Sequence, residues 1–202
     1  MGDKILTIHN ERHWEKQSHI PKRGRKIHPL YQLDNVFWPD YKQMCEEAVS
    51  VRSKLDTYDP TADKNSTIKV HYMADDTPLL NNMWQGWTER YGTFSGVTVS
   101  YFYIDPGMEY GWHIDTNISQ DMSGKGSILC AMNIVLTDTH EAKTEFLGLG
   151  EVEYTAALFN TSHVHRVHIG NVPRILARIT FRDTIYEELV HKIKKIDKHY
   201  AE

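Results

Sequence analysis

The half of the chain that decides the fold begins at Val97-Thr98-Val99-Ser100-Tyr101-Phe102-Tyr103-Ile104, a run of β-branched and aromatic residues. Five similar runs follow, separated by turn-forming segments such as Asp-Pro-Gly and Gly-Asn-Val-Pro. The six runs are residues 97–104, 127–136, 144–149, 152–159, 164–169 and 175–181. Short strands in succession predict an antiparallel barrel or a double-sheet sandwich. We therefore expect a mainly β fold.

Helical patterns flank this β-rich region on both sides. Between residues 37 and 92, apolar residues recur at steps of three and four, which predicts supporting helices around a short strand at 67–73. One of these helices is expected to begin at Thr77-Pro78 and to stop at Gly92. A last helix is expected over residues 184–199. Together these patterns predict a single domain over 1–202, with its β-rich core at 97–182.

Composition limits the classes of function. The 202 residues are 40% hydrophobic and 25% charged, with a formal net charge of −4, so no overall basic field indicates nucleic acid or an anionic membrane. Residues 1–30 form a polar, partly basic arm without the apolar core of a signal peptide. Cys45 and Cys130 both lie in apolar surroundings, which favours buried thiols in a reducing compartment. We expect a cytoplasmic protein that does not bind membranes.

A first pair of metal-ligand residues lies in the stretch Tyr110-Gly111-Trp112-His113-Ile114-Asp115. If this segment is extended, its period of two places His113 and Asp115 on the same face. A lone His-x-Asp is a weak signal in a chain with 12 histidines. The assignment therefore depends on a third ligand elsewhere.

Candidates for that ligand lie in residues 158–168, which contain His163, His165 and His168. Two histidines and one carboxylate form the open facial arrangement that binds Fe(II), whereas zinc more often takes a closed set or an open hydrolytic site. Arg174 and Arg178 follow in a strand-like run. A buried guanidinium needs a counter-charge, which a dicarboxylate ligand would supply, and this favours iron.

These residues resemble the 2-oxoglutarate- and Fe(II)-dependent dioxygenases, in the order His-x-Asp, a distal His, and an Arg one short strand later. The resemblance covers about residues 97–181 and is closest to the prolyl-hydroxylase-like and aspartyl/asparaginyl-hydroxylase-like branches, including short phage-type members. It implies a double-stranded β-helix, or jelly roll. It also implies that His113, Asp115 and His165 hold the iron, that Arg174 pairs with the far carboxylate of 2-oxoglutarate, and that Tyr103 contacts this co-substrate.

Several residue assignments have rivals. The segment Phe159-Asn160-Thr161-Ser162-His163-Val164-His165-Arg166-Val167 is similar to the family pattern with His165 in the ligand position, while His163 and His168 remain alternatives. Arg178 is expected to share the face of Arg174 and is the rival for the co-substrate. Asn133, on a central strand, is a further residue that could reach the co-substrate carboxylate.

The resemblance implies hydroxylation of a substrate, with O2 consumed and 2-oxoglutarate decarboxylated to succinate. The substrate is expected to be a peptide side chain or a small metabolite. A nucleobase is less favoured, because the Arg-x-Asn-x-x-x-Arg pattern of nucleic-acid dealkylases is missing. The alternative is a non-enzymatic, cupin-like jelly roll that binds a metal or another ligand. The sequence predicts neither the substrate's identity nor the oligomeric state.

Overall fold

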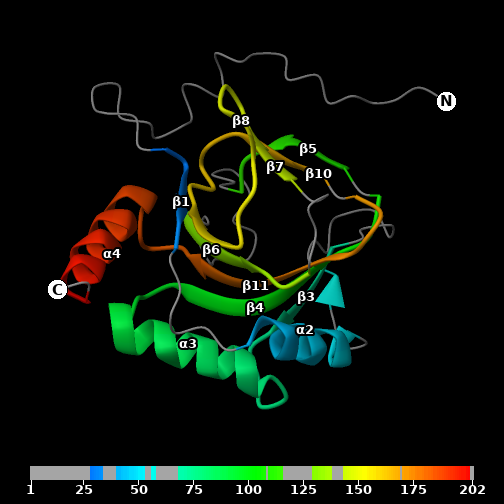
Figure 1. Ribbon diagram of the computed structural model, residues 1–202, viewed down its shortest axis with the longest axis horizontal. Coiled ribbons are helices and arrows are strands. Elements are labelled where there is room, and N and C mark those ends of the chain that lie inside the picture. Colours follow the sequence, from blue (N-terminus) through cyan, green and yellow to red (C-terminus); the bar gives the residue numbers. More distant parts are fainter. Residues whose placement is uncertain are drawn as a thin grey trace.

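Two antiparallel β-sheets face each other in the computed structural model, and helices cover the outer side of the larger sheet (Figure 1). The structure describes residues 28–33, 40–52, 56–57, 68–107, 109–115, 129–137, 143–168 and 170–200. The predicted basic arm therefore lies almost wholly outside the described residues. Within the described helices, none is both long and apolar enough to cross a membrane.

The large sheet has seven strands in the order β1-β9-β6-β11-β4-β3-β2, and the small sheet has four in the order β5-β10-β7-β8. The strands are β1 (Leu30–Gln32), β2 (Asp56–Thr57), β3 (Ile68–Tyr72), β4 (Val97–Ile104), β5 (Glu109–His113), β6 (Cys130–Val135), β7 (Lys143–Phe146), β8 (Gly150–Val152), β9 (Ala156–Phe159), β10 (His165–His168) and β11 (Arg174–Phe181). The helices are α2 (Tyr41–Ser50), α3 (Pro78–Tyr91) and α4 (Tyr186–Tyr200).

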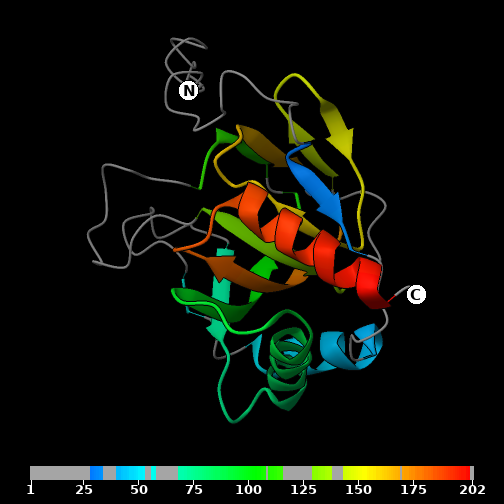
Figure 2. The ribbon, with the colours of Figure 1, turned by 90° about the vertical axis from the view of Figure 1, so that its left-hand side faces the viewer.

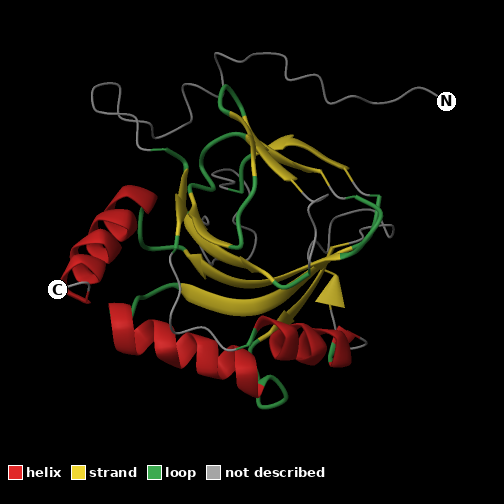
Figure 3. Ribbon diagram, viewed as in Figure 1, coloured by secondary structure: helices red, strands yellow, loops and turns green. Residues whose placement is uncertain are grey.

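The outer face of the large sheet forms the main core with the helices (Figure 3). Trp87 of α3 is fully buried there and lies 5.8 Å, between ring centroids, from Phe181 of β11. Helix α4 contacts β9 and α3, and it crosses the sheet in Figure 2. Trp87 thus packs α3 against the large sheet, as expected for one of the supporting helices.

The inner face of the large sheet meets the small sheet. Phe102 of β4 and Leu176 of β11 pack there with Val167, which comes from β10 of the small sheet. A second contact joins Phe159 of β9 to Phe146 of β7, with ring centroids 5.5 Å apart. Both faces of the central strands are consequently buried, one under helices and the other under the second sheet.

Each predicted β-rich run contains an observed strand, one run is divided, and strands β1, β2 and β5 lie outside the six runs. The run predicted at residues 152–159 is broken, and its residues belong to two strands: β8 ends at Val152, in the small sheet, and β9 begins at Ala156, in the large one. This division lets the chain pass from one sheet to the other. The mainly β fold with flanking helices is confirmed.

Candidate metal centre

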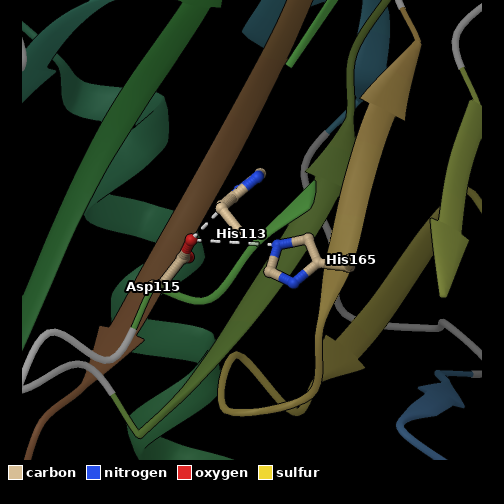
Figure 4. A group of neighbouring side chains, drawn as sticks. All are labelled: His113, Asp115 and His165. Carbon is tan, nitrogen blue, oxygen red and sulfur yellow. Dashed lines mark ion pairs between the residues drawn. The ribbon is translucent and has the colours of Figure 1, made fainter. Parts of the chain in front are cut away.

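His113, Asp115 and His165 converge at the end of the small sheet (Figure 4). His113 ends β5 and His165 begins β10, and the two residues stand opposite each other in the antiparallel pairing. Asp115 lies two residues beyond His113, where its backbone N–H donates to the carbonyl of Thr161 at 3.0 Å. Strand pairing and this one turn contact therefore place all three side chains.

The ligand atoms face one another. Asp115 Oδ1 lies 3.5 Å from His113 Nε2 and 3.8 Å from His165 Nε2. The imidazole centroids are 4.4 Å apart. The His165 side chain is only 7% exposed, against 36% for His113, so His113 forms the solvent-facing side of the group.

Hydrogen bonds to the backbone orient both imidazoles. His113 Nδ1 donates to the carbonyl of Gly111 at 2.7 Å, and His165 Nδ1 donates to the carbonyl of His163 at 2.8 Å. A carbonyl oxygen can only accept, so Nδ1 carries the hydrogen in each neutral ring and Nε2 keeps its lone pair. This is how metal-binding histidines are commonly held.

The charge states also suit a metal ion. Burial lowers the pKa of His165 to about 4, against the attraction of Asp115, so this ring is neutral at pH 7. Burial would raise the pKa of Asp115, but the charge of Arg178 and the two imidazoles hold it well below its usual range. Burial lowers the pKa of His113 as well, and its interaction with Asp115 more than offsets this and raises the pKa. An ionised carboxylate and a neutral imidazole are the forms that bind metal.

The two rival histidines lie elsewhere. His163 sits in a turn, where its backbone N–H donates to the carbonyl of Asn160 and its Nε2 lies 3.2 Å from the carbonyl oxygen of Leu147. His168 points to the outer side of the small sheet, where its Nε2 lies 3.2 Å from Glu145 Oε2. Of the three, the structure brings His165 to His113 and Asp115.

The outer side of the small sheet holds a second group of possible ligands, formed by Glu145, Glu151 and His168. Glu145 is already engaged by Arg166, whose Nη2 lies 2.5 Å from Oε2. Glu151 is paired with Lys143 at 2.8 Å. These half-exposed charges satisfy one another, and we interpret the group as a surface ion network.

The two predicted arginines lie on the inner face of β11 and have different partners. Arg174 is 2% exposed and donates from Nη2 to the hydroxyl of Tyr154 at 2.6 Å. Arg178 donates from Nη2 to Asp115 Oδ2 at 2.5 Å. The Cα atoms of the two arginines are about 13 Å apart at the usual strand rise, so the two guanidinium groups serve different partners.

The structure corrects the prediction for Tyr103. This residue alternates with Phe102 and Ile104 on β4 and packs in the core between the large sheet and the helices. The guanidinium of Arg52 lies 4.5 Å from the centroid of its ring. Because Tyr103 faces the opposite side of the sheet from Arg174, it does not reach the interior where a co-substrate would bind.

Tyr154 is a partner of Arg174 that the sequence did not predict. It lies between β8 and β9, outside any periodic run, and its ring centroid is 4.9 Å from that of Phe159 and 5.5 Å from the Arg174 guanidinium.

Asn133 lies beside Arg178 in the pairing of β6 with β11, is 7% exposed, and has no hydrogen-bond partner at Oδ1 among the described residues.

Comparisons with known proteins support the fold. No protein-family profile matches the sequence, and no curated protein matches it. A prolyl-4-hydroxylase from Pseudomonas putida superposes with a TM-score of 0.51 at 16% identity, covering 78% of this chain and 94% of the other. A prolyl hydroxylase from Trichoplax adhaerens, solved with a hypoxia-inducible-factor peptide fragment, gives a TM-score of 0.56 at 10% identity, covering 83% and 86%.

The chain thus has the jelly-roll fold of the prolyl hydroxylases, as the sequence resemblance implied. At these identities the likeness defines the architecture. A group of two histidines and one aspartate that could hold a metal ion lies between the strands of this fold.

Proposed function

We propose that this protein is a 2-oxoglutarate- and Fe(II)-dependent oxygenase that hydroxylates a protein side chain or a small metabolite. The observation that carries the proposal is the convergence of His113 Nε2, His165 Nε2 and Asp115 Oδ1, with both Nδ1 atoms bonded to carbonyls. Two imidazoles and one carboxylate are the ligands of non-haem Fe(II) oxygenases, which keep positions open for other molecules. Two solved structures with this fold are prolyl hydroxylases.

The interior also fits an anionic co-substrate. Arg174 is a buried cation, and its Nε has no hydrogen-bond partner among the described residues. A buried charge of this kind is costly unless a counter-ion completes it. We propose that the far carboxylate of 2-oxoglutarate fills this place and that the other end of the molecule lies at the metal.

Apolar side chains lie on the inner face between the two charged groups. Leu176 separates Arg174 from Arg178 along β11 and packs against Phe102 and Val135. These side chains would line the methylene carbons of the co-substrate and exclude water from it.

When bound, iron with 2-oxoglutarate and O2 supplies the oxidising chemistry that hydroxylates a C–H bond and yields succinate and CO2. The chain's own contribution is orientation. His113, Asp115 and His165 would hold the metal. Arg174, which is hydrogen-bonded to Tyr154, would hold the co-substrate. No side chain is required as a nucleophile.

The proposal predicts that the purified protein, given Fe(II), ascorbate and 2-oxoglutarate, forms succinate even without its substrate, although slowly. Both Asp115→Ala and His165→Ala should reduce this turnover to background, because each removes a ligand. His168→Ala is the matched control: it removes a histidine of the same strand that faces outward, and it should retain turnover. Succinate can be measured by mass spectrometry.

Wild-type protein that binds Fe(II) and 2-oxoglutarate yet forms no succinate, even with fractionated lysate as a source of substrate, would instead support the non-enzymatic alternative. Unchanged turnover in Asp115→Ala would remove the metal centre from the proposal altogether.

A further inference from the structure

The two oxygens of Asp115 have different partners. Oδ1 faces the Nε2 atoms of His113 and His165, at 3.5 and 3.8 Å. Oδ2 accepts a hydrogen bond from Arg178 Nη2 at 2.5 Å. Only Oδ1 is therefore directed at the point between the imidazoles (Figure 4).

The partner of Oδ2 is itself held firmly. Arg178 is 8% exposed and its guanidinium carbon lies 5.2 Å from the ring centroid of Phe102. It projects from the middle of β11, which is paired on both sides, with β4 and with β6. Since Asp115 follows β5 of the small sheet, the ion pair also connects the two sheets.

Arg178, the rival of Arg174 for the co-substrate, has a different partner. Both arginines lie on the inner face of β11, but Arg174 contacts Tyr154, whereas Arg178 contacts a metal-ligand residue. Two similar side chains, four positions apart on one strand, thus contact different groups.

We propose that Arg178 is a positioning residue for the metal, which fixes Asp115 so that it binds through Oδ1 alone. A carboxylate with both oxygens available can chelate a metal through both, and this would occupy a position that the open site needs for its co-substrate. Holding Oδ2 on a guanidinium prevents this and keeps the carboxylate from rotating. This inference rests on the proposed function.

A guanidinium suits this task better than a neutral donor. Asp115 is largely buried, and an ionised carboxylate in such a place needs a counter-charge before any metal arrives. Arg178 supplies that charge and directs its N–H groups in a fixed plane, so the carboxylate is already oriented in the metal-free protein.

The test is an anaerobic Co(II) titration of the wild type, Arg178→Met, Arg178→Lys and Arg174→Met, followed by the visible d–d spectrum of the bound ion. Without the guanidinium, Asp115 is no longer held with Oδ1 toward the two imidazoles. Loss of such a hydrogen-bond partner typically costs about 10- to 100-fold in metal affinity, and we expect it to outweigh the gain from removing a nearby positive charge, so Arg178→Met should bind Co(II) at least about tenfold more weakly. Its spectrum should change, because the coordination of Asp115 changes. Arg178→Lys keeps the positive charge but loses the planar guanidinium. Its Co(II) affinity should lie between those of the wild type and Arg178→Met.

Arg174→Met is the matched control, because it removes an equally buried guanidinium from the same face of the same strand. It should leave both Co(II) affinity and the spectrum as in the wild type. If Arg178→Met fails to fold, Arg178→Lys decides the question, and the proposal requires it to bind Co(II) more weakly than the wild type.

Wild-type affinity and spectrum in the Arg178 variants would overturn the inference, and so would an equal loss in Arg174→Met. A wild type that binds Co(II) but forms no succinate with Fe(II) would refute the oxygenase and leave this test intact. A wild type that binds no divalent metal would refute the metal centre and, with it, the role of Arg178.

Discussion

At the scale of single residues, the hydroxyl group of Tyr154 orients the side chain of Arg174. Tyr154 accepts its hydrogen bond at 2.6 Å and lies beside the guanidinium. An arginine side chain has many rotamers, and fixing it before a ligand arrives lowers the entropy cost of binding. Tyr154 therefore orients the arginine for the carboxylate that we assign to it.

We predict that Tyr154→Phe weakens 2-oxoglutarate binding at least about tenfold, since a hydrogen bond to a charged group is worth about 1.5–3 kcal/mol. Metal affinity should stay unchanged. Tyr103→Phe is the control, because its ring faces the helices, and it should bind 2-oxoglutarate like the wild type. Titration of the Mn(II)-loaded proteins measures both affinities. A loss confined to Tyr103→Phe would contradict the placement of both tyrosines.

The error over Tyr103 has a physical cause. In β4 the residues from Val99 to Ile104 are all buried, because helices cover one face and the small sheet covers the other. Hydrophobic alternation therefore carries no information on which face Tyr103 occupies. Tyr154 could not have been found either, since its contact with Arg174 arises from a loop between the sheets.

The choice among the three histidines was limited in a similar way. In an extended strand His163 and His165 would share a face, and only the turn at residues 160–163 separates them. The sequence favoured His165 through the family pattern, and the structure places that residue opposite His113.

At the scale of elements, Glu47 of α2 acts as the N-terminal cap of α3. Its carboxylate accepts from the backbone N–H groups of Leu79 at 2.8 Å and Leu80 at 3.1 Å, and from the Tyr101 hydroxyl at 2.6 Å. Thr77, the expected cap, instead exchanges hydrogen bonds with Ala74. A carboxylate is favoured at a helix N-terminus by the helix dipole. Glu47 thus joins two helices and the central strand β4.

Glu47→Ala should lower the free energy of unfolding by about 3 kcal/mol, because it leaves two helical N–H groups and a buried hydroxyl without their acceptor. Glu47→Gln should lose less, since it keeps one acceptor oxygen. The neighbouring, exposed Glu46→Ala should change stability by less than about 0.5 kcal/mol. Urea unfolding followed by circular dichroism measures all three, and equal effects at the two positions would contradict this role.

The elements themselves were largely predictable, whereas their connections were not. The bounds of α3 follow from Thr77-Pro78 and Gly92, signals that act within one turn of a helix. Strands β1 and β2 are two or three residues long and gave no run to recognise. The division between β8 and β9 depends on the second sheet, which no local pattern encodes.

At the scale of the whole molecule, the proposed site spans the two sheets. The residues that would hold the metal belong to the small sheet and the turn after β5, while Arg174 and Arg178 belong to the large sheet. Apolar packing and the Asp115–Arg178 pair connect the two sheets. A co-substrate that chelates the metal and reaches Arg174 would add a further link.

This arrangement predicts that the two ligands stabilise the protein together more than separately. Mn(II) at 100 times its dissociation constant should add about 2.7 kcal/mol, which is a rise in Tm of roughly 5–10 °C for a chain of this size. 2-Oxoglutarate should raise Tm further only when metal is present, because without metal it has one anchor instead of two. Differential scanning calorimetry without Fe(II) avoids turnover. Asp115→Ala should lose both shifts, whereas Arg174→Gln should keep the metal shift and lose the additional one. An equal shift from 2-oxoglutarate with and without metal would show that it binds elsewhere, and the bridge between the sheets would then have to be abandoned.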